Sequence, residues 1–248
     1  MPERRASFEA EPAASSALPL IGRQRELHAL GALFAQGSRV LVLGPRGIGK
    51  TRLIQESAAA AGISLARPDA HGSLHEFLEG LLPLTCTGTI RPASVRRLSS
   101  QTLQSRALAA LQSRPRWLWI DDPAPAGARL YRFLQRVLWI RGCGLAVCAQ
   151  NREQLGYLGR LLWDPREEVR LRPLSRHDAA RLMREAMRAS GLESRGCPED
   201  FLEQVLDAAA GNPGRIVTLC RLAAQPQYWH GGHLMFAPLW IDTLTRLA

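Results

Sequence analysis

Short apolar runs alternate with stretches of helical periodicity over the first two thirds of the chain. Residues 40–43 (Val-Leu-Val-Leu) are the kind of β-branched, apolar run that forms a buried parallel strand. Residues 117–120 and 144–149 are two further runs, and each ends at polar residues. Residues 63–66 and 168–171 give weaker strand signals. Strands that alternate with helices predict an α/β domain with a parallel sheet.

The last third of the chain has a helical pattern. Ser175 and Asp178 are spaced as at a helix N-terminus, and the apolar positions of residues 179–187 share one helical face. Another helix is predicted to begin at Pro198 and to end at Gly211. These apolar faces predict a small helical domain with a core of its own.

The two ends of the chain have different patterns. Residues 1–17 lack an apolar run, which argues against a secretory signal and predicts a disordered tail. Residues 228–236 surround a Gly-Gly pair and predict a short hairpin. The apolar residues 238–248 predict an added strand or a docking tail. The expected organisation is a tail (1–18), an α/β core (19–172), a helical domain (173–224) and a C-terminal hairpin or tail (225–248).

A glycine-rich loop follows the first strong strand. Residues 44–51, Gly-Pro-Arg-Gly-Ile-Gly-Lys-Thr, match the pattern GxxxxGK[ST], and a helical pattern follows them as this motif requires. Gly47 and Gly49 let backbone N–H groups point at a β-phosphate, where the helix N-terminus adds partial positive charge. Lys50 supplies a point charge for the β- and γ-phosphates, and Thr51 supplies a hydroxyl for Mg²⁺.

Two carboxylates end the next strong strand. Asp121 and Asp122 follow residues 117–120, and Pro123 prevents the strand from continuing. We expect these carboxylates beside the phosphate loop, because parallel strands share one carboxyl edge. Asp121 is predicted to support Mg²⁺, and Asp122 to polarise an attacking water as a general base. The alternative is a solvated acidic turn.

Polar residues also end the strand at residues 144–149. Gln150 or Asn151 would hold the attacking water by hydrogen bonding, and Arg152 would stabilise phosphoryl charge. An ordinary loop accounts for each of these three residues equally well.

Six segments of the chain follow one another in a recognisable order. They are Leu20-Ile21-Gly22-Arg23-Gln24-Arg25-Glu26-Leu27, the loop at 44–51, the acidic strand at 117–122, the strand tip at 149–152, residues 169–175, and Gly211-Asn212-Pro213-Gly214-Arg215. In this order they resemble the landmarks of the AAA+ ATPases and the related STAND ATPases (signal-transduction ATPases with numerous domains), in which residues 20–27 match the opening box, residues 169–175 the lid entry and residues 211–215 the sensor-2 turn. Of the six, only the phosphate loop is specific by itself.

The resemblance implies a P-loop NTPase fold, with a five-stranded parallel sheet flanked by helices and followed by a small helical lid. It places ATP and Mg²⁺ between core and lid, with the first landmark at the adenine and the last closing over the nucleotide. The implied nucleotide-binding residues are Ile21, Gly22, Arg23, Gly44, Pro45, Arg46, Gly47, Ile48, Gly49, Lys50, Thr51, Arg52, Pro213 and Arg215. The implied catalytic residues are Asp122, Asn151 and Arg152, and Thr51 and Asp121 are the implied Mg²⁺ residues.

Departures from the family pattern bear on turnover. Many AAA+ enzymes have Asp-Glu where this chain has Asp121-Asp122, which favours slow hydrolysis, as in STAND switches that use ATP as a conformational signal. Arg215 lies one step from the usual sensor-2 position. The intersubunit arginine finger stays unassigned among Arg129, Arg132, Arg136 and Arg141.

Composition adds an expectation about partners. The 248 residues carry a formal net charge of +10, and Lys50 is the single lysine among 32 basic residues. The arginine bias is typical of a compositional habit of a genome, yet the net charge favours an acidic partner such as DNA. Five cysteines without a CxxC pair argue against a zinc ribbon or a disulfide framework. The histidine pairs His71/His75 and His230/His233 lack nearby Cys or acidic partners for a metal.

Two classes of function remain open, both at a cytoplasmic location, since no apolar run is long enough to span a membrane. The first is an AAA+-like protein that binds and hydrolyses ATP and forms a homo-oligomer or switches conformation on DNA. The second is a STAND-type signalling or scaffold switch that acts on a protein partner. A nucleotide kinase with the same loop is disfavoured by the adenine box and the lid turn.

Overall fold

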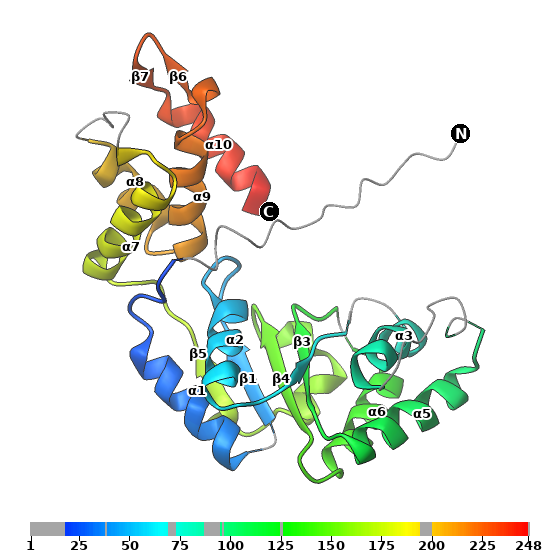
Figure 1. The fold of residues 1–248 in the computed structure, drawn as a ribbon. Helices are drawn as coiled ribbons and strands as arrows, with labels where there is room; N and C mark the ends of the chain where they lie inside the picture. Colours follow the sequence, from blue (N-terminus) through cyan, green and yellow to red (C-terminus); the bar gives the residue numbers. More distant parts are fainter. Residues whose placement is uncertain are drawn as a thin grey trace, which may run out of the picture. The chain divides into compact units, whose positions relative to one another are not determined.

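The computed structural model describes residues 18–37, 39–68, 73–86, 95, 97–124, 126–193 and 200–247. These residues form two compact units (Figure 1). The first unit contains residues 23–172, and the second joins residues 173–247 to residues 18–22. The predicted tail before Leu18, His71 and the predicted helix start at Pro198 lie outside the described residues.

A five-stranded sheet forms the centre of the first unit (Figure 1). All of its neighbouring strands are parallel, which confirms the predicted α/β class. The register sets Leu43 beside Ala149 and Asp121 beside Cys148, so three strands end level at one edge. The strand order is β2 (Leu65–Ala66), β3 (Trp117–Asp121), β4 (Gly144–Ala149), β1 (Arg39–Leu43) and β5 (Glu168–Arg170).

Helices cover both faces of this sheet. On one face α1 (Gln24–Gln36) packs against α2 (Lys50–Ala60), and Phe34 meets Trp117 of β3 edge-on with ring centroids 4.9 Å apart. On the other face three helices bury a large apolar cluster with alternate strand residues such as Leu118 and Leu145. These helices are α3 (Leu74–Thr85), α5 (Ser100–Ser113) and α6 (Ala128–Leu138). The 3₁₀ turns η1 (Glu153–Leu155), η2 (Tyr157–Arg160) and η3 (Pro165–Glu167) connect β4 to β5.

The second unit is built from helices around a separate apolar core, as predicted. Leu18 and Ile21 from the start of the chain contribute to this core. Ser175 caps α7 by accepting a hydrogen bond from the backbone N–H of Asp178. The elements are α7 (Arg176–Ala189), α8 (Phe201–Ala209), α9 (Pro213–Ala223), η5 (Pro226–Tyr228), the antiparallel hairpin β6 (Trp229–His230) and β7 (His233–Leu234), and α10 (Phe236–Leu247).

Helix α10 occupies the segment that was expected to be an added strand or a docking tail. It packs on α9, and its residues Leu239 and Thr243, four positions apart, are fully buried. Pro238 is tolerated because it lies in the first turn, where its missing N–H has no partner to lose. The apolar composition of the segment hid the helical spacing of its buried positions. Within the described ranges, no helix is both long and apolar enough to span a membrane.

Two glycines provide a test of this packing. A Cβ added at Gly144 would lie 2.4 Å from the Trp117 ring, whereas a Cβ at Gly31 on α1 would meet no atom within 4 Å. We expect Gly144→Ala to lower the free energy of unfolding by about 1–3 kcal/mol through overpacking. Gly31→Ala should raise it by up to about 1 kcal/mol through helix propensity. Urea denaturation of both variants checks this, and equal effects of the two substitutions would contradict the placement of β4 against β3.

Candidate functional site

The phosphate-loop sequence connects β1 to α2 at the carboxyl edge of the sheet. Gly44, Gly47 and Gly49 have positive φ angles of 156°, 77° and 99°, which favour glycine. Gly49 is the N-cap of α2, and no side chain caps this helix end. A Cβ added at Gly49 would meet no atom within 4 Å. The loop therefore leaves open space at an uncapped helix N-terminus, which is an arrangement that suits an anion.

Lys50 is the first residue of α2, and only 8% of it is exposed. Its ammonium group donates to the carbonyl oxygens of Gly44 at 2.7 Å and Pro45 at 3.1 Å, so the side chain folds back across the loop. Burial lowers the pKa of Lys50 from its ordinary value, although the nearby Asp122 and Asp121 carboxylates act in the opposite direction. An anion that enters the loop would meet this partly desolvated charge.

Asp121 ends β3 and joins two other elements at its carboxylate. Thr51 Oγ1 of α2 donates to Asp121 Oδ2 at 2.9 Å. Arg67, which directly follows β2, donates to the same oxygen at 2.8 Å. The structure thus brings the two predicted Mg²⁺ residues together. Arg67 was not among the residues predicted from the sequence, although an arginine directly after a strand on this sheet edge was the available signal.

Asp122 lies at the turn after β3 in a strained conformation, with φ of 49°. Its backbone N–H donates to the Cys148 carbonyl oxygen at 2.9 Å. Its Oδ1 atom is buried and has no hydrogen-bond partner among the described residues. Strain and an unsatisfied buried oxygen both cost free energy, and both are common where a ligand completes a site. Thr51, Asp121 and Asp122 offer the hard oxygen atoms that fit Mg²⁺ and its water shell.

The tip of β4 is a closed turn. The side-chain oxygen of Gln154 accepts the Gln150 N–H at 2.8 Å, and Asn151 Oδ1 accepts the Gln154 N–H at 3.1 Å. Gln150 and Asn151 are both exposed. Asn151 therefore already uses its side-chain oxygen within the turn, while its amide group is the part that could orient a water.

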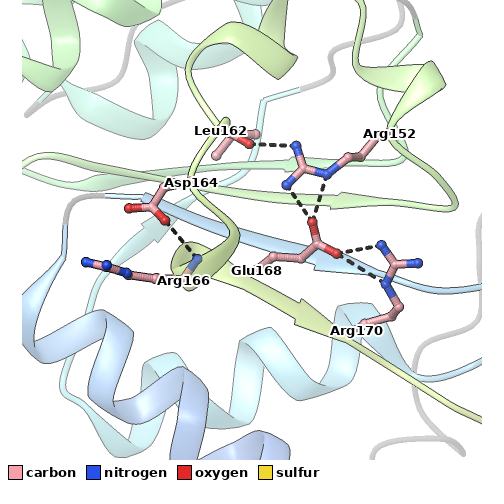
Figure 2. Close-up of polar contacts among 6 residues, drawn as sticks. All are labelled: Arg152, Leu162, Asp164, Arg166, Glu168 and Arg170. Carbon is pink, nitrogen blue, oxygen red and sulfur yellow. Dashed lines mark hydrogen bonds and ion pairs between the residues drawn. The ribbon is translucent and has the colours of Figure 1, made fainter.

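Arg152 is held by Glu168 of β5, as Figure 2 shows. Two guanidinium nitrogens contact Glu168 Oε2 at 2.8 and 2.6 Å, and a third donates to the Leu162 carbonyl oxygen at 3.0 Å. Arg170 binds the other Glu168 oxygen at 2.7 Å. Burial alone would raise the pKa of Glu168, but the hydrogen bonds from Arg170 and Arg152 outweigh it and leave the pKa lowered. All three guanidinium nitrogens of Arg152 therefore have partners in this arrangement.

The N-terminal box divides between the two units. Ile21 is buried in the core of the second unit, where a Cβ on Gly22 would lie 2.9 Å from the Asp178 carboxyl group. Arg23 begins the first unit and is 4% exposed. It donates to the carbonyl oxygen of Ile48 at 3.3 Å and pairs with Glu26 at 3.2 Å. Arg23 therefore supports the phosphate loop through a hydrogen bond to the loop backbone, a structural role that was not predicted from the sequence.

The remaining predicted residues lie in both units, and some of them have partners close by. In the second unit Pro213 begins α9, and the Arg215 guanidinium lies 5.7 Å from the centroid of the Trp240 ring. In the first unit Arg52 pairs with Glu56 at 2.7 Å, and Arg46 is exposed. The arginine-finger candidates Arg129, Arg132, Arg136 and Arg141 are all exposed.

Comparisons with known proteins agree with this geometry at the level of the fold. No protein-family model and no curated protein sequence matches the chain. Among solved structures, Orc1 of Aeropyrum pernix in complex with DNA is 18% identical, with a TM-score of 0.60 over 92% of this chain and 66% of that one. Cdc6p of Pyrobaculum aerophilum is 15% identical, with a TM-score of 0.63 over 87% of this chain and 64% of that one.

A STAND protein with a tetratricopeptide-repeat sensor, from Pyrococcus horikoshii, also matches, at 16% identity and a TM-score of 0.52 over 93% of this chain and 34% of that one. The chain has the fold of the AAA+ P-loop ATPases. It spans just under two thirds of the length of the Orc1 and Cdc6p chains. In this fold, the loop that carries Lys50 follows β1, and the Asp121 and Asp122 carboxylates lie at the end of β3 on the same edge of the sheet.

The lowered pKa of Lys50 predicts the pH dependence of triphosphate binding. Only the protonated ammonium attracts phosphate, and burial makes Lys50 lose its proton at a lower pH than an exposed lysine. The affinity for ATP should therefore fall as pH rises, beginning below the ordinary lysine pKa of 10.5. Calorimetric titration between about pH 7 and pH 10 measures this. The Lys50→Arg variant should bind ATP more weakly than the wild type. Because arginine keeps its charge over that range, the ATP affinity of this variant should not change with pH. A wild-type affinity that stays equally level would contradict the buried ammonium as the binding charge.

Proposed function

We propose that the chain binds ATP with Mg²⁺ at the phosphate loop and hydrolyses it slowly. One observation supports this most directly: the buried ammonium of Lys50, the Thr51–Asp121 hydrogen bond and the Oδ1 atom of Asp122, which has no partner among the described residues, lie at one edge of the first unit. A cation for phosphate, oxygen atoms for a metal and a carboxylate for a water are the parts that phosphoryl transfer requires.

Each residue of this group has a distinct role in the proposal. Lys50 would neutralise the β- and γ-phosphates, while Thr51 and Asp121 would hold Mg²⁺, which would supply charge stabilisation to the leaving ADP. Asp122 accepts a proton from the attacking water through its open oxygen atom. Asn151 orients that water, and Arg152 stabilises phosphoryl charge after exchanging Glu168 for phosphate. The cost of breaking the Arg152–Glu168 pair is a reason for slow turnover.

We also propose that nucleotide binding is a switch. The helical second unit contains Ile21, Gly22, Pro213 and Arg215, which would act as a lid that contacts adenine and phosphate. ATP would shift the equilibrium between the open and closed conformations of such a lid. The size of the shift would equal the difference between the affinities of ATP for the two conformations. We propose that the chain forms a homo-oligomer and that ATP binding changes its interface.

DNA is the proposed acidic partner. The net charge of +10 gives the chain a positive field that attracts polyanions. One structure with the same fold is Orc1, which was solved in complex with DNA. A STAND-type switch that acts on a protein partner is the second candidate, because the Asp121-Asp122 pair favours slow hydrolysis and a STAND protein shares the fold.

The substitution Asp122→Asn separates binding from chemistry. Removing the charge of the proposed base should lower the rate of ATP hydrolysis about 100-fold or more, with ATP affinity changed by less than about threefold. Phosphate release and equilibrium binding measure the two effects. Lys50→Ala should lose binding itself, and Asp207→Asn, an exposed carboxylate of the second unit, is the matched control. Hydrolysis at the parent rate in Asp122→Asn would exclude Asp122 as the base.

The DNA proposal predicts nucleotide-dependent binding to duplex DNA. Fluorescence anisotropy at moderate salt should show tighter binding with ATP than without it, and the affinity should fall steeply as salt rises. Lys50→Ala should bind DNA equally with and without ATP. Absence of any ATP-dependent DNA affinity in the wild type, together with a copurifying protein partner, would favour the STAND-type switch instead.

A further inference from the structure

The contact between Arg67 and Asp121 has no place in the roles described so far. We propose that Arg67 is a tethered counter-cation for the Mg²⁺ carboxylate, which sets how strongly nucleotide binding depends on Mg²⁺. The inference rests on the proposed function, since it concerns the same ATP and Mg²⁺ site. It adds a residue that tunes the metal requirement without being a metal ligand.

The position of Arg67 follows from strand pairing. β2 ends at Ala66, which pairs with Leu118 of β3, so Arg67 lies level with Trp119. The guanidinium carbon lies 4.6 Å from the centroid of the Trp119 ring, and an Nη atom donates to Asp121 Oδ2 at 2.8 Å. The buried ring supports one face of the guanidinium and directs it along the strand toward the carboxylate.

Asp121 accepts hydrogen bonds from a charged donor and from a neutral hydroxyl. Thr51 supplies a hydroxyl and Arg67 supplies a full positive charge, both to the same oxygen. The Asp121 side chain is 11% exposed, so its charge is weakly screened, whereas the Arg67 side chain is 52% exposed. A half-exposed guanidinium is partly hydrated and exchanges partners readily. The Arg67–Asp121 pair is therefore strong enough to neutralise part of the carboxylate charge, and weak enough for a divalent cation to displace Arg67.

Two opposite effects follow from this arrangement. Without Mg²⁺, Arg67 offsets the repulsion between the Asp121 carboxylate and an incoming triphosphate, so it favours binding of metal-free ATP. With Mg²⁺, the same guanidinium competes for the negative charge that holds the metal and its water shell. Removing the charge of Arg67 should weaken metal-free binding and lower the Mg²⁺ concentration that the complex needs. If Arg67 merely positioned Asp121, removing its charge would weaken metal-free ATP binding and would raise, not lower, the Mg²⁺ concentration that the complex needs.

The experiment measures ATP affinity by calorimetry, first in EDTA and then over a series of free Mg²⁺ concentrations, in wild type and Arg67→Gln. The ATP dissociation constant in EDTA should rise about 3- to 10-fold, and the half-saturating Mg²⁺ concentration should fall about 3- to 10-fold. Arg67→Lys keeps the charge and should stay close to wild type. Arg67→Met keeps the aliphatic stem over Trp119 and should reproduce Arg67→Gln, which separates charge from packing.

Arg116→Gln is the matched control. Arg116 precedes β3 at the opposite edge of the sheet and donates to the Ser64 hydroxyl at 3.1 Å, so this variant removes the same charge away from the site. It should leave both quantities unchanged. Unchanged Mg²⁺ dependence in Arg67→Gln, or a rise in both quantities, would overturn the inference while leaving ATP binding itself established. Failure of the wild type to bind ATP at any Mg²⁺ concentration would instead contradict the proposed function, and the inference with it.

Discussion

The parallel pairing of β1 with β4, and of β4 with β3, is the constraint on which the candidate site depends. It brings the connection after β1, with Lys50 and Thr51, to the same edge as the end of β3, with Asp121 and Asp122. These groups lie about 70 residues apart in the chain, yet Thr51 and Asp121 are hydrogen-bonded at 2.9 Å. Any slip of this register would separate the Lys50 ammonium from the Asp121 and Asp122 carboxylates.

The charged groups at this edge mostly have hydrogen-bond partners within the chain. Lys50 is satisfied by loop carbonyl groups, and Asp121 by Thr51 and Arg67. The buried Oδ1 atom of Asp122 has no hydrogen-bond partner among the described residues. Arg152 is paired with Glu168 (Figure 2). In the proposed function, a triphosphate with its metal would exchange these internal pairs for ligand contacts.

Sequence patterns were sufficient for the strong strands, because runs such as residues 40–43 and 144–149 must be apolar throughout when helices cover both faces. The phosphate loop was predictable because its chemistry is local. Contacts that depend on the pairing of distant strands could not be predicted from the sequence. Arg67 reaches Asp121 only through the pairing of β2 with β3, and Arg152 meets Glu168 only because β5 returns to the sheet. The helix α10 was hidden because its buried positions lie within a generally apolar segment.

A crystal structure of the chain with a non-hydrolysable ATP analogue and Mg²⁺ would show where a nucleotide binds. We expect the β-phosphate within hydrogen-bond distance of the backbone N–H groups between Gly47 and Thr51, and Mg²⁺ held by Thr51 and Asp121. We also expect the Lys50 ammonium to have moved from the Gly44 and Pro45 carbonyl oxygens to phosphate oxygens. A nucleotide bound elsewhere, with Lys50 still on those carbonyl oxygens, would show that this sheet edge is not the nucleotide site.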